Sequence, residues 1–139
     1  MYNIIIEVIP PTKQRYQTVG DWQVAPADVE TRVFSGPPQP VDLLVRVSNT
    51  GDRRANCALI VHELVEAMLC SLQGVTQAEV DEWDMGPGAE LDEPGDSQLA
   101  PYHDQHVKAE LLERQLANFL GLEWDEYMGL IETAAHAYP

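Results

Sequence analysis

The chain has 139 residues, a length that predicts a single domain, residues 1–139, with a sizeable hydrophobic core. Its 8 basic and 23 acidic residues give a formal net charge of −15, which argues against sequence-independent binding to nucleic-acid phosphates. The sequence has no run of about 18 apolar residues, and its first ten residues lack a positively charged leader and contain Glu7. We therefore expect no membrane span, no signal peptide and a cytoplasmic location.

The first half of the chain predicts β-strands, because short apolar and β-branched segments are separated by proline and glycine. A Pro-Pro pair follows the first segment, a Gly-Asp bend or bulge interrupts the second, and Gly-Pro-Pro follows the third. The four expected strands are residues 3–9, 15–24, 31–35 and 41–48.

The second half predicts four helices, residues 52–73, 77–83, 102–120 and 123–137. Gly74 ends the first helix, and Thr76 with Glu79 forms a capping box that starts the second. Residues 86–101 are rich in Gly, Pro and acids and predict a long loop, which is often functional or mobile. Strands followed by helices predict an α+β fold, with a small, mostly antiparallel sheet in residues 1–50 packed against about four helices in residues 52–139.

The first expected helix carries the most informative pattern. Residues 57–70 read C-A-L-I-V-H-E-L-V-E-A-M-L-C, and only His62, Glu63 and Glu66 among them are strongly polar. A helix that is apolar nearly all round is normally buried, where two carboxylates and an imidazole are costly unless a partner such as a metal ion satisfies them. Cys57 and Cys70 lie about 20 Å apart on this helix, too far for a disulfide, and we expect two buried thiols.

Helical geometry gives these polar residues different roles. His62 and Glu66 are one turn apart along the helix and about 40° apart around it, so both can ligate one ion. Glu63 lies about 100° from His62 and can reach a water at the metal without being a ligand. The pattern H-E-x-x-E has the geometry of the H-E-x-x-H metalloproteases, with Glu66 in place of the second His. It predicts Glu63 as a catalytic general base.

The third expected helix carries a second cluster. His103, His106 and Glu110 lie within an arc of about 60°. His106 borders the apolar stripe of this helix, so we expect His106 as the third ligand and His103 as the alternative. Glu110 could accept a hydrogen bond from an imidazole and orient it, or ligate the ion itself. Three protein ligands and one water are the pattern of an open, catalytic zinc site.

Simpler interpretations stay open at this point. The polar residues of the first helix could form a partly exposed stripe, and the two histidines of the third helix a solvated polar face. The acids of residues 81–96 lack EF-hand spacing, so they do not indicate calcium. A nucleophilic pair of Cys70 and His106 has no sign of an exposed or activated thiol. The acidic charge could also mimic nucleic acid toward a basic partner.

The segment H-E-L-V-E-A-M-L-C is similar to the active-site helix of zincin metallopeptidases. The whole chain more closely resembles a family of small, largely uncharacterised phage and prophage proteins described as zincin-like. The segments that carry this resemblance are R-Y-Q-T-V-G-D-W at 15–22, R-V-S-N-T-G-D at 46–52, H-E-L-V-E-A-M-L-C at 62–70, E-P-G-D at 93–96 and A-P-Y-H-D-Q-H at 100–106. The resemblance implies a small sheet against the metal helix and, for a phage protein, the host cytoplasm. It implies no particular substrate.

These features predict a zincin-like domain with Zn²⁺ held by His62, Glu66 and His106, and peptide hydrolysis assisted by Glu63. A peptide or protein substrate could add as a strand along an exposed sheet edge at residues 41–48, and the loop of residues 86–101 would cover the site. The alternative is a non-catalytic phage accessory or assembly protein with a structural or vestigial metal site. The sequence leaves the oligomeric state open.

Overall fold

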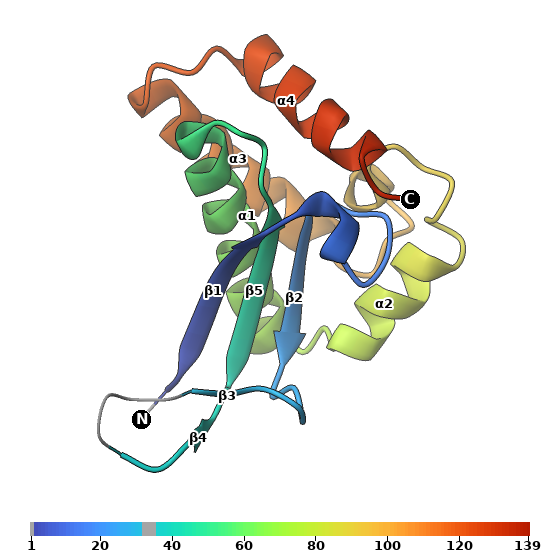
Figure 1. Ribbon diagram of the computed structural model, residues 1–139. Coiled ribbons are helices and arrows are strands. Elements are labelled where there is room, and N and C mark those ends of the chain that lie inside the picture. Colours follow the sequence, from blue (N-terminus) through green and yellow to red (C-terminus); the bar gives the residue numbers. More distant parts are fainter. Residues whose placement is uncertain (1, 32–35) are drawn as a thin grey trace.

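The computed structural model describes residues 2–31 and 36–139 and shows an α+β domain, with its strands in the N-terminal part and its helices in the C-terminal part (Figure 1). The strands are β1 (Ile4–Ile9), β2 (Gly20–Val24), β3 (Glu30–Thr31), β4 (Gln39–Pro40) and β5 (Leu43–Ser48). The helices are α1 (Arg53–Gln73), α2 (Gln77–Met85), α3 (His103–Phe119) and α4 (Trp124–His136), with short 3-10 turns η1 (Pro11–Lys13) and η2 (Pro94–Asp96). The expected sheet and four helices are confirmed. The strand expected at residues 31–35 lies, apart from Thr31 in β3, outside the described residues.

The main sheet is mixed and has the strand order β1-β5-β2 (Figure 1). β1 pairs parallel with β5, β2 pairs antiparallel with β5, and β3 and β4 form a separate antiparallel pair. The main sheet thus has one parallel and one antiparallel pairing, where a mostly antiparallel sheet was expected. The parallel pairing arises because the chain returns to the start of β1 before β5 begins, where the Asp42 N–H donates to the Asn3 carbonyl at 2.9 Å.

β5 is the central strand, so the expectation that residues 41–48 offer an edge to a substrate is wrong. Its side chains Leu43, Leu44, Val45 and Val47 are each at most 2% exposed. A continuous apolar run of this kind is typical of a strand that is covered on both faces. The edges are β1 and β2, and β2 is shorter than expected because it begins at Gly20.

α1 is the core helix of the domain and packs against β5, β2 and α3. By length and composition alone it could cross a membrane, but such helices also form the cores of globular domains, and the buried apolar residues of α1 belong to this core. Asp52 caps its N-terminus by accepting hydrogen bonds from two backbone N–H groups, and Gly74 ends it in the left-handed conformation.

The two cysteines of α1 differ in exposure, because Cys70 is buried and Cys57 is exposed. The expectation of two buried thiols is therefore wrong for Cys57. Thirteen residues of helix rotate the two side chains about 140° apart, so they cannot both face the sheet.

Candidate metal centre

α1 places three charged or polar side chains in the interior of the protein. His62, Glu63 and Glu66 are 6%, 8% and 5% exposed, and His106 from α3 is 4% exposed. Their interpretation as a partly exposed stripe on α1 and a solvated face on α3 is therefore wrong for these four residues. Buried charged and polar groups need hydrogen-bond partners, and His62, Glu66 and His106 are partners of one another.

Three ligand atoms converge on one point. His62 Nε2 lies 3.1 Å from Glu66 Oε2 and 3.2 Å from His106 Nδ1, and His106 Nδ1 lies 3.0 Å from Glu66 Oε2. Atoms bound to a tetrahedral zinc ion at about 2.0–2.1 Å lie about 3.3–3.4 Å apart, so this triangle is close to the size that zinc requires. Two imidazole nitrogens and one carboxylate oxygen also form a donor set that suits zinc. These three residues could hold a metal ion.

The outer side of each ligand is held by a hydrogen bond. His62 Nδ1 lies 2.9 Å from Glu113 Oε1, and the Tyr127 hydroxyl donates to the other oxygen of Glu113. Trp22 Nε1 donates to Glu66 Oε1 at 3.1 Å. An N–H at Nδ1 of His62 leaves the Nε2 lone pair free to face the centre of the triangle. Such outer contacts fix the orientation of metal ligands and raise their basicity.

Electrostatics favour a positive charge at the centre of the triangle. Burial lowers the pKa of His62, but hydrogen bonds to Glu113 and Glu66 raise it more, so its pKa lies well above 6.5. Burial likewise lowers the pKa of His106, and the hydrogen bond to Glu66 reverses the shift. Burial raises the pKa of Glu66, but its hydrogen bonds from both imidazoles bring the pKa to about 2. Protons on the imidazoles thus supply a charge that a divalent cation could supply instead.

Glu63 differs from its neighbours because its carboxylate has no hydrogen-bond partner among the residues that the structure describes, and its oxygens keep a small contact with solvent at 8% exposure of the residue. Burial and the nearby charge of Glu66 raise its pKa well above 4.5. Its space is provided by Gly20 of β2, since a Cβ atom there would overlap the Glu63 carboxylate. A buried carboxylate with a raised pKa and no partner is a candidate for proton transfer.

Part of the long loop lies against the third ligand. Asp96 Oδ1 is 3.1 Å from His106 Nε2, and a Cβ atom at Gly95 would overlap the His106 ring. The loop is anchored by Trp83 Nε1, which donates to the Pro94 carbonyl at 3.0 Å. The expected alternative ligand His103 also contacts this loop, because its Nδ1 lies 2.9 Å from the Gly95 carbonyl oxygen. It is not part of the triangle of ligand atoms.

Glu110 was expected to orient an imidazole, but the carboxylate beside the His62 imidazole is that of Glu113. The Glu110 carboxylate lies 3.6 Å from the Arg114 guanidinium on the same helix. A sequence signal for Glu113 existed, since it is seven residues from His106 and therefore on the same face of α3. Trp22 and Asp96 had no comparable signal, because their positions relative to α1 depend on the sheet and the loop.

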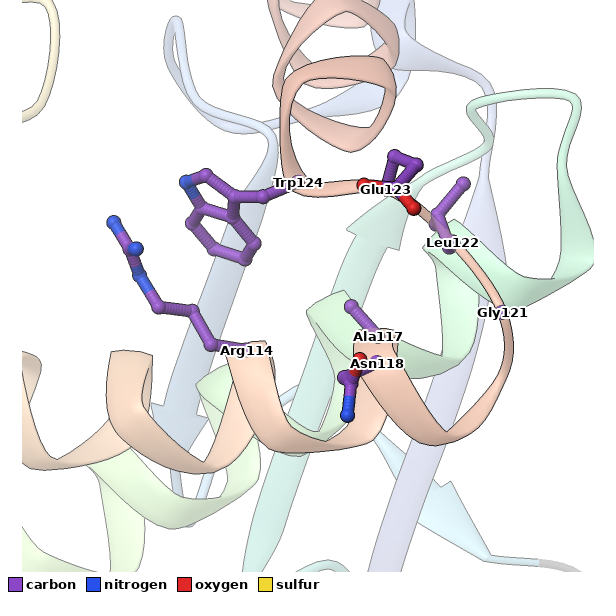
Figure 2. A pocket seen from close by; sticks show the side chains of 7 residues that line it. All are labelled: Arg114, Ala117, Asn118, Gly121, Leu122, Glu123 and Trp124. Atoms are coloured by element: carbon purple, nitrogen blue, oxygen red, sulfur yellow. The ribbon is translucent and has the colours of Figure 1, made fainter.

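A separate pocket of about 240 Å³ lies between the end of α3 and the start of α4 (Figure 2). The Arg114 guanidinium stacks over the Trp124 indole, 4.2 Å from the ring centroid, at one side of this pocket. None of the four buried residues of the candidate metal centre lines it.

No protein-family model, curated protein or solved structure matches this chain. The functional argument therefore starts from the residues of the candidate centre.

Proposed function

We propose that the chain binds a zinc ion through His62, Glu66 and His106 and hydrolyses peptide bonds with Glu63 as the general base. The observation that carries the proposal is the convergence of three buried ligand atoms, all within 3.2 Å of one another. The resemblance of residues 62–70 to the active-site helix of zincins supports the same chemistry, as does the unpartnered carboxylate of Glu63.

A zinc ion at this position supplies Lewis-acid activation of water and of a substrate carbonyl. Glu63 accepts a proton as the water oxygen bonds to the carbonyl carbon. It then returns this proton to the amine nitrogen as the C–N bond breaks. Glu113 keeps the His62 imidazole oriented throughout, and Trp22 holds the far oxygen of Glu66.

β2 is the sheet edge that lies beside the candidate centre. Trp22 contacts Glu66 and Gly20 adjoins Glu63, so this strand runs directly beside the candidate centre. In the described residues β2 pairs with β5 on one side only. A peptide substrate on this side would lie along the centre and pair with the outward backbone groups around Trp22, because those of Gly20 and the N–H of Val24 already have side-chain partners.

Metal analysis tests the first half of the proposal. Protein purified without a chelator is expected to contain one zinc ion per chain, and EDTA is expected to lower its Tm. His106→Ala removes a ligand and is expected to lose the ion, whereas Glu110→Gln leaves the triangle intact and is expected to keep it. Zinc retained by His106→Ala would contradict the ligand assignment.

Glu63→Gln tests the second half. The variant keeps the size of the side chain but cannot accept the proton, so it is expected to bind zinc normally and to lose hydrolysis of a peptide library. Unchanged turnover would refute the general-base role, while zinc binding in both proteins would leave the ligand assignment standing.

A non-catalytic role, as an accessory or assembly protein with a structural metal, is favoured by burial, since the three ligands are only 4–6% exposed. X-ray absorption spectroscopy of the zinc form separates the two roles. Three protein ligands and a water oxygen support hydrolysis, whereas four protein ligands support a structural site.

A further inference from the structure

The outer edge of β1 is open for pairing. β1 is the last strand of the order β1-β5-β2, and in the described residues it pairs only with β5. The carbonyls of Asn3 and Ile9 accept hydrogen bonds from β5 and from the residue after it. The odd-numbered residues of β1 therefore direct their N–H and C=O groups toward β5. The backbone N–H and C=O groups of Ile4, Ile6 and Val8 point away from the sheet.

This edge lacks the features that normally prevent pairing between proteins. Edge strands usually carry lysine, proline or a bulge, whereas the side chains of Ile4, Ile6 and Val8 are 39%, 45% and 45% exposed. The only charged residue of β1 is Glu7, and it is paired with Arg46 of β5 at 2.9 Å.

The other edge, β2, is closed over part of its length by side chains of the same chain. The Val24 N–H donates to the Gln77 side chain at 2.7 Å, and the buried Asp21 carboxylate of this strand binds Arg15. In the described residues, β1 is therefore the edge whose outward backbone groups are open along its whole length.

The distribution of charge indicates which partner fits. Residues 1–60 contain six basic and six acidic side chains, whereas residues 61–139 contain two basic and seventeen acidic ones. The net charge of −15 therefore lies entirely in the second part, and β1 lies in the neutral part. A basic partner would be attracted to the acidic helices and not to β1. Two copies of this chain can meet through β1 without bringing unpaired acidic side chains of this strand together, because Glu7 is its one charged residue and is paired with Arg46.

We propose that β1 pairs antiparallel with β1 of a second copy, around a two-fold axis at Ile6. In this register Ile6 faces Ile6 of the second copy, and Ile4 faces Val8, so every pair on this face is apolar. Glu7 falls opposite Ile5, which keeps the two acidic side chains from facing each other directly. The dimer has one continuous sheet of six strands, three from each copy, and its interface is isologous.

The oligomeric state tests the interface. Sedimentation at micromolar concentration is expected to give twice the monomer mass of 15.5 kDa. Ile6→Lys places two positive charges at the two-fold axis and is expected to weaken dimerisation at least 100-fold. The matched control is Val24→Lys, since Val24 is 47% exposed on the other edge, and it is expected to remain dimeric. A monomeric native protein, or dimerisation unchanged in Ile6→Lys, overturns the proposal.

Cross-linking tests the register even if the lysine variant does not fold. In a Cys57→Ser background, which removes the exposed thiol, Ile6→Cys is expected to form a disulfide-linked dimer under mild oxidation. Directly opposed residues of a hydrogen-bonded antiparallel pair have Cα atoms about 5.5 Å apart, a distance that a disulfide spans. Cross-linking through Val24→Cys, and not through Ile6→Cys, would overturn the proposal.

Discussion

Replacing Glu63 with Gln is expected to stabilise the metal-free protein, although it removes the proposed general base. Glu63 is 8% exposed and has no hydrogen-bond partner among the described residues. Burial and the charge of Glu66 raise its pKa well above 4.5, so the ionised carboxylate opposes folding near neutral pH. An uncharged amide at the same place avoids this repulsion.

The size of the effect follows from the missing partner. A buried polar group without a hydrogen bond costs about 1–3 kcal/mol, and a charged one costs more. We therefore expect Glu63→Gln to gain about 1–3 kcal/mol at neutral pH. For a domain of this length, that gain corresponds to an increase in Tm of roughly 3–10 °C.

The gain is expected to depend on pH in one direction. Below pH 4.5, the ordinary value, Glu63 is protonated in both the folded and the unfolded state, so the two proteins have similar stability. As the pH rises through the raised pKa of the folded state, the native protein loses stability that the variant keeps. Denaturant titrations in EDTA between about pH 4 and pH 8 measure the difference between the two proteins.

The matched control is Glu110→Gln, because Glu110 is half-buried and paired with Arg114. This variant is expected to change stability by less than about 0.5 kcal/mol across the same range. The reasoning fails if Glu63→Gln is no more stable than the native protein at neutral pH, or if its gain is equally large at pH 4.5.

Three further outcomes follow from the same geometry. Glu113→Gln is expected to weaken zinc binding about 10–100-fold, measured by competition with a chromophoric chelator, because His62 loses its anionic hydrogen-bond acceptor. Gly20→Ala is expected to lower hydrolysis more than zinc affinity, since the three atoms nearest to the new methyl group all belong to Glu63. Zinc affinity is expected to rise with pH above 6.5, because the raised pKa values of His62 and His106 keep both imidazoles protonated until then; a flat profile would contradict this.

The candidate centre was largely predictable from the sequence because its pattern is local. Three polar residues, His62, Glu63 and Glu66, lie in an apolar helix. Helical geometry allows His62 and Glu66 to bind one ion and turns Glu63 about 100° away from His62. His106 was preferred to His103 because it borders the apolar stripe of its helix, and the structure brings His106, not His103, into the triangle. The helical periodicity of the two segments is enough to predict these positions, because none of them depends on the strand order of the sheet.

The sheet was harder to predict because strand order depends on contacts between distant residues. The apolar run at residues 41–48 indicates a strand covered on both faces, but it does not show which strands lie on either side of β5. The contact of Trp22 with Glu66 spans 44 residues along the chain and exists only because β2 lies next to β5 over α1. Local patterns in the sequence contain no information of this kind.

The distribution of hydrogen bonds within the centre argues for a reactive role of Glu63. His62, Glu66, His106 and Glu113 form one connected network in which each side chain has a partner. Glu63 is equally buried, stands beside the same network and takes no part in its hydrogen bonds. If the centre served only to hold the fold together, a neutral or apolar side chain at this position would be more stable. A carboxylate kept there at a cost in stability, in space that Gly20 leaves open, is what proton transfer beside a metal requires.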